Sequence, residues 1–72
     1  MKKFSVLIAG RHATSISLEE EFYQELLNIA ASKKTTVSAL VTEIDETRTV
    51  PNLSAAIRLY ILKSLKEQIK SN

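Results

Sequence analysis

Residues 13–44, ATSISLEEEFYQELLNIAASKKTTVSALVTEI, decide the fold of this 72-residue chain. They begin with a two-residue alternation and continue with a helical pattern, a polar turn and a second helical pattern. Apolar side chains at every second residue indicate a half-buried strand, and apolar side chains at every third or fourth residue indicate an amphipathic helix. The stretch therefore predicts a strand, a helix, a tight turn and a second helix, in that order.

The strand is predicted over about residues 12–18. Alternation gives it a core face of Thr14, Ile16 and Leu18 and an exposed face of Ala13, Ser15 and Ser17. One strand cannot form a sheet alone, and a two-stranded ribbon is marginal in water. A chain of this size without cysteine also lacks disulfides to stabilise a small core. We therefore expect the strand to pair with the same strand of a second copy.

Three helices are predicted, over about residues 19–32, 37–46 and 53–69. Ser17 and Glu20 have the spacing of a capping box for the first helix. Thr36 and Asn52 are the expected N-caps of the second and third helices. The apolar stripes that should face the core are Phe22, Leu26, Ile29 and Ala30; then Val37, Leu40, Val41 and Ile44; and then Leu53, Ala56, Ile57, Tyr60, Ile61 and Leu65. Arg58 lies opposite the last stripe and is expected in solvent.

The N-terminal segment allows more than one conformation. Phe4, Val6 and Ile8 alternate with other residues, so residues 3–9 could be extended and half-buried, and Gly10 permits a bend. Whether this segment extends the ribbon or folds elsewhere stays open. MKKFSVLIAG imitates a secretory signal, but its apolar run is followed by Gly10 and Arg11 instead of a small-x-small cleavage site, so we expect a cytoplasmic protein. No apolar run approaches the roughly 20 residues of a membrane span, so no membrane association is expected.

Charge is unevenly distributed along the chain. Residues 1–18 carry three basic residues and no acidic one, residues 19–46 carry seven acidic and two basic residues, and residues 47–72 carry five basic residues and one acidic residue. Basic charge at both ends suggests a polyanionic partner, provided that the acidic middle faces away from it.

Enzymatic chemistry has little support in the sequence. His12 is the only histidine, Gly10 is the only glycine, and cysteine is absent. These counts remove thiolate metal sites and glycine-rich phosphate loops and leave no nucleophile and base in a recognisable pattern. We expect no catalytic residues, no metal site and no cofactor.

Four segments together resemble the ribbon-helix-helix family of DNA-binding proteins: IAG (8–10), TSISLEEEFYQEL (14–26), TVSALVTEID (36–45) and NLSAAIRLYIL (52–62). The last segment is similar to a compact bacterial subgroup with an additional C-terminal helix. The resemblance implies a mainly α fold with one short β-strand, in one domain over residues 1–72. It also implies an intertwined homodimer whose two strands form an antiparallel ribbon.

The resemblance further implies a DNA-binding transcriptional regulator, with repression as the expected mode. A two-stranded ribbon fits the major groove of double-stranded DNA, and its outward side chains face the bases. The expected base-facing residues are Arg11, Ala13, Ser15 and Ser17. In the family the start of the second helix holds a phosphate, since free N–H groups and the helix dipole attract anions. The expected phosphate-binding residues are His12, Lys33, Lys34, Thr36, Val37 and Ser38.

Two other functions remain open. Small proteins of this family often act as antitoxins, and the C-terminal helix could dock a protein partner in a groove. Alternatively, the fold is a protein-interaction module whose outward strand residues, Ala13, Ser15 and Ser17, bind DNA weakly or without specificity. Little salt-dependent DNA affinity would favour these alternatives over a regulator.

Overall fold

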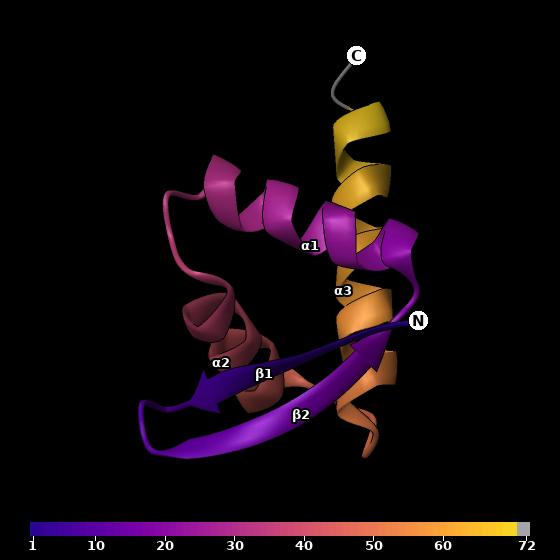
Figure 1. The fold of residues 1–72 in the computed structure, drawn as a ribbon. Helices are drawn as coiled ribbons and strands as arrows, with labels where there is room; N and C mark the ends of the chain where they lie inside the picture. The colour runs from indigo at the N-terminus through magenta and orange to yellow at the C-terminus, as the bar shows by residue number, and fades with distance from the viewer. Residues whose placement is uncertain (71–72) are drawn as a thin grey trace.

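The computed structural model describes residues 1–70, which form a two-stranded hairpin and three helices (Figure 1). The elements are β1 (Lys2–Ile8), β2 (His12–Leu18), α1 (Glu20–Ser32), α2 (Val37–Thr47) and α3 (Leu53–Lys70). Residues 71 and 72, which the predicted domain includes, lie outside the described residues.

The sheet is a hairpin within one chain. β1 pairs antiparallel with β2, with Lys2 opposite Leu18 and Ile8 opposite His12. The prediction of a single strand is therefore wrong, because residues 2–8 supply a second strand. The alternation of Phe4, Val6 and Ile8 is the sequence signal of this strand. Since β2 has a partner in its own chain, a second copy is not required to form a sheet.

A tight turn joins the two strands. Ala9 and Gly10 have positive φ angles of 53° and 67°, and the Arg11 N–H donates to the Ile8 carbonyl over 2.9 Å. Two central residues with positive φ are typical of a type I′ turn, whose twist suits a hairpin. Because Ile8 lies opposite His12, Arg11 is an additional residue beside the turn.

Two of the three N-caps predicted from the sequence are present in the structure. The Thr36 hydroxyl accepts from the Ala39 N–H, and the Asn52 side-chain oxygen accepts from the Ala55 N–H, each over 3.0 Å. These two predicted caps are confirmed. The predicted capping box at the first helix is wrong: Glu19 is the N-cap of α1, and no side chain caps it. Ser17 belongs instead to β2, where it lies opposite Lys3.

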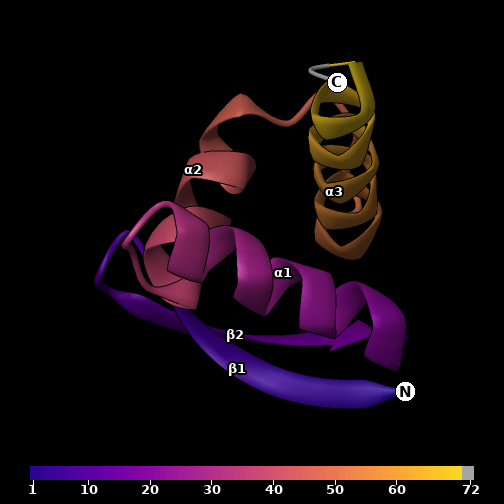
Figure 2. The ribbon, with the colours of Figure 1, turned by 90° about the horizontal axis from the view of Figure 1, so that it is seen from above.

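The core lies between the hairpin and the helices. α2 packs along β1 and α3 contacts β2, whereas α1 packs against both other helices; Figure 2 shows α3 nearly end-on beside α1. Alternation directs one face of each strand inward, and the helical stripes meet it as predicted. The buried apolar residues are Val6, Ile8, Ile16, Leu18, Leu26, Ile29, Ala30, Leu40, Val41, Ile44, Ala56, Ile57 and Ile61. Within residues 1–70, no helix has the length and apolar character needed to cross a bilayer.

Candidate nucleic-acid interface

The hairpin face that points away from the helices carries serine and alanine on β2 and lysine, serine and an exposed leucine on β1. Cross-strand pairs on it are Lys3 with Ser17, Ser5 with Ser15, and Leu7 with Ala13. Five of these six residues are exposed, and Ser17 is half-buried. The predicted outward face of β2 is therefore present, but β1 contributes as many residues to the surface as β2 does. We call this six-residue surface the outward face.

The outer edge of β1 is attached to α2. The Leu7 N–H donates to the Ser38 hydroxyl, and the Ala9 N–H donates to the Thr42 hydroxyl, each over 3.0 Å. The Thr42 hydroxyl in turn donates to the Ser38 carbonyl over 2.9 Å. These side chains provide the hydrogen-bond partners that a further strand on the outer edge of β1 would otherwise supply.

The direction of the Leu7 N–H also determines which groups lie on the free edge of β2. Because this N–H points to Ser38, Leu7 and Ala13 form a pair without mutual hydrogen bonds. Antiparallel pairs alternate, so the backbone N–H and C=O groups of Ala13, Ser15 and Ser17 all point away from β1. Within residues 1–70, no hydrogen bond from outside the hairpin reaches these three residues. β2 therefore has an open edge, and β1 has a partly closed one.

The start of α2 lies beside the hairpin turn. A shallow depression there is lined by Leu7, Ala9, Gly10, Thr36, Ser38, Ala39 and Thr42. The Thr36 hydroxyl accepts from the Ala39 N–H and the Ser38 hydroxyl from the Leu7 N–H, so an anion at this site would be bound by backbone N–H groups near Val37 and by the O–H donors that the two hydroxyls retain. Thr36 is exposed, whereas Val37 and Ser38 are half-buried.

The two lysines before α2 have different surroundings. The Lys33 ammonium lies 5.5 Å from the centre of the Tyr60 ring, and a side-chain hydrogen bond with Tyr60 raises the pKa of Lys33 above its usual value of 10.5. Lys33 is thus directed to α3. Lys34 is exposed in the turn with φ 55°, which places its backbone in the left-handed region.

Arg11 and His12 are exposed at the hairpin tip, next to Gly10. The structure therefore brings Ala13, Ser15 and Ser17 together on the outward face and places Thr36 and Ser38 beside the turn. It directs the Lys33 side chain to Tyr60 of α3 instead. Lys3 and Ser5 lie on the outward face but were absent from the predicted site, although the alternation of residues 3–9 would have placed them there once the segment was paired.

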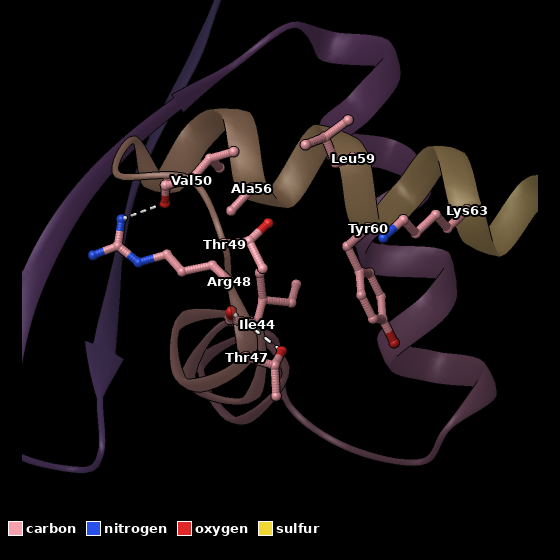
Figure 3. Close-up of a pocket in the computed structure, with 9 residues that line it drawn as sticks. All are labelled: Ile44, Thr47, Arg48, Thr49, Val50, Ala56, Leu59, Tyr60 and Lys63. Atoms are coloured by element: carbon pink, nitrogen blue, oxygen red, sulfur yellow. Dashed lines mark hydrogen bonds between the residues drawn. The ribbon is translucent and has the colours of Figure 1, made fainter.

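A second hollow lies between α2 and α3 (Figure 3). Its volume is about 110 Å³, well below the roughly 300–1,000 Å³ typical of ligand pockets. Arg48 at its rim is bound to Asp45 over 3.0 Å and to the carbonyls of Val50 and Pro51. The hollow therefore offers little room for a small-molecule substrate. The described residues 1–70 contain no cluster of three or more residues suited to hold a metal ion.

A strand face followed by two helices with a short turn between them is the arrangement of ribbon-helix-helix domains. The model of the ribbon-helix-helix domain family matches residues 1–65, so this chain belongs to that family. Its members generally bind DNA, regulate transcription and form dimers, and they are typically not enzymes. The match begins at residue 1 and so includes β1 as well as β2. No curated protein and no solved structure gives a significant match.

Proposed function

We propose that this chain is a homodimeric transcriptional repressor of a bacterial cytoplasm, which inserts paired β2 strands into the major groove. The observation that carries the proposal is the open edge of β2, which lies beside the small side chains that β2 contributes to the outward face. Two copies that pair antiparallel along this edge form a ribbon related by a two-fold axis. The predicted intertwined ribbon is thereby retained as β2 with β2 of the partner, with β1 outside each.

In this arrangement Ala13, Ser15 and Ser17 of both copies face the bases, with Arg11 near the ends of the ribbon. Serine hydroxyls donate or accept and discriminate weakly between bases, and Ala13 offers apolar contact to a thymine methyl. Bidentate contacts by Arg11 to guanine would add stronger discrimination. We therefore expect modest sequence specificity that depends partly on Arg11.

The start of α2 would hold the DNA backbone. Thr36, Val37 and Ser38 supply N–H groups at the start of α2; Lys34 is exposed two residues before Thr36, and His12 is exposed beside the hairpin turn. Lys33 is retained in this group only if its ammonium leaves Tyr60 on binding. Phosphate contacts of this kind fix register and carry no sequence information.

Proline substitutions on the two strands test the dimer. The Ser15 N–H points to the open edge of β2, so Ser15→Pro keeps the hairpin hydrogen bonds but removes a donor from the proposed ribbon. Ser5 lies opposite Ser15, and its N–H points away from β2, so Ser5→Pro is the matched control. We expect mass measurements in solution to give a monomer for Ser15→Pro and a dimer for Ser5→Pro and wild type. Equal masses for the three proteins would exclude pairing along β2.

Selection of duplexes from a random library tests the regulator itself. We expect an enriched two-fold-symmetric motif and a log affinity that falls steeply with log salt concentration. Ser15→Glu should abolish binding while the hairpin stays folded, because its carboxylate faces DNA in both copies. Gln24→Glu adds the same charge at an exposed position of α1, and its affinity for the duplex should lie closer to that of wild type. Salt-dependent binding without a motif would leave a non-specific DNA-binding protein.

A second candidate is an antitoxin-type or other protein-interaction dimer. The observation in its favour is exposed apolar surface on α3, where Leu59, Leu62 and Ile69 are 45%, 46% and 72% exposed. This function predicts a stable dimer with little salt-dependent affinity for DNA. The duplex selection described above therefore separates the two candidates.

A further inference from the structure

β1 extends the outward face beyond the strand that would read DNA. Lys3 is exposed on this face, directly opposite Ser17 of β2. It is the only charged residue among the six members of the outward face. Since residues 1–18 contain no acidic residue, no carboxylate within the hairpin neutralises it.

The neighbouring lysine points the other way. The Lys2 ammonium lies 5.4 Å from the centre of the Tyr23 ring of α1, and Tyr23 packs against Phe4 with a ring separation of 4.9 Å. Alternation along β1 thus gives two lysines of equal charge on opposite faces of the hairpin. Only Lys3 lies on the face that would approach DNA.

The spacing between strands determines which part of the DNA Lys3 would contact. Adjacent strands lie about 4.8 Å apart, so in the order β1, β2, partner β2, partner β1 the two outer strands are about 14 Å apart. The major groove of B-DNA is about 12 Å wide. The two central strands therefore fit into the groove, whereas the two outer strands lie over its walls, where the phosphates are.

We infer that β1 is a phosphate-binding strand, and that Lys3 of each copy contacts the DNA backbone on one side of the groove. This inference rests on the proposed function. It assigns sequence-independent affinity to β1 and sequence reading to β2. A ribbon of two strands alone would lack these contacts, so β1 adds affinity to a β2 strand whose base-facing residues are only serine and alanine.

The test compares Lys3→Gln with Lys2→Gln, using the full chain and the duplex selected by wild type. Each neutralised phosphate contributes about 0.9 to the slope of log affinity against log salt, so loss of two contacts per dimer lowers that slope by about 1.8. We expect this decrease for Lys3→Gln, a much smaller one for Lys2→Gln, and a near wild-type slope for Lys3→Arg. The selected motif should be the same in all four proteins.

Circular dichroism and mass in solution establish that each variant is a folded dimer. Equal slopes for the two glutamine variants, or a changed motif for Lys3→Gln, would overturn the role of Lys3 while leaving the proposed regulator intact. Absence of DNA binding by wild type would instead reject the proposed function, and the inference with it.

Discussion

Arg58 of α3 binds the carboxylate of Glu19 with two hydrogen bonds. Its Nε donates to Oε1 over 2.8 Å, and its Nη2 donates to Oε2 over 3.2 Å. Arg58 also lies 6.0 Å from the centre of the Phe22 ring. The expectation that Arg58 is solvated is therefore wrong. Glu19 stands between β2 and α1, so this pair connects the third helix to the junction of hairpin and first helix.

The pair between Arg58 and Glu19 makes the free energy of unfolding depend on pH. The hydrogen bond from Arg58 holds the pKa of the Glu19 carboxyl below its usual value of 4.5. A carboxyl whose pKa is lower in the folded state stabilises it above the unfolded pKa, and this contribution is lost as pH falls through the folded pKa. We expect Glu19→Gln to lower the free energy of unfolding at pH 7, with the deficit relative to wild type shrinking below pH 4.5.

Urea denaturation between pH 7 and pH 3 measures this difference. Glu46→Gln, at an exposed position of α2, is the matched control. A deficit for Glu19→Gln that stays constant through the acid range would show that the pair does not contribute through its charge.

The Thr36 cap contributes to stability independently of any role in DNA binding. Thr36→Ala removes the acceptor for the Ala39 N–H and should lower the free energy of unfolding by about 1 kcal/mol. Thr36→Ser keeps an acceptor and should lie close to wild type. Thermal denaturation of the three proteins measures the effect, and equal stability of the alanine and serine variants would contradict it.

The closed edge of β1 depends on Ser38. Ser38→Ala leaves the Leu7 N–H without its side-chain acceptor and should cost at most about 1 kcal/mol, because water can reach this edge. Amide hydrogen exchange gives the sharper measurement, since the Leu7 amide should exchange faster while the Val6 amide, on the β2 side of the strand, changes little. Unchanged exchange at Leu7 would show that the Ser38 hydroxyl does not protect this amide.

The hairpin turn contains an unfavourable residue at Ala9, which has φ 53°. Asparagine tolerates the left-handed region better than alanine, so Ala9→Asn should stabilise the protein by up to about 1 kcal/mol. Gly10→Ala should destabilise it by about 1–2 kcal/mol through backbone strain alone, because a Cβ at Gly10 would meet no atom within 4 Å. Opposite signs of the two shifts in Tm are the expected result, and stabilisation by Gly10→Ala would contradict the observed turn.

The sequence by itself determined the features that depend on local patterns. Periodicity fixes which face of β2 and of each helix is apolar, and Thr36 and Asn52 cap their helices because a side-chain oxygen reaches an amide only three residues away. Such interactions form within one element, so they can be recognised without knowing what that element packs against.

Only the tertiary structure decided the partners of these elements. Alternation in residues 3–9 and 12–18 is compatible with pairing within one chain or between two chains, and Ala9-Gly10 is a weaker turn signal than Asn-Gly. Arg58 meets Glu19 and Lys33 meets Tyr60 because three helices converge on the hairpin, at separations along the chain that no local pattern encodes. The same packing places Ser38 and Thr42 on the outer edge of β1 and so leaves β2 with the open edge.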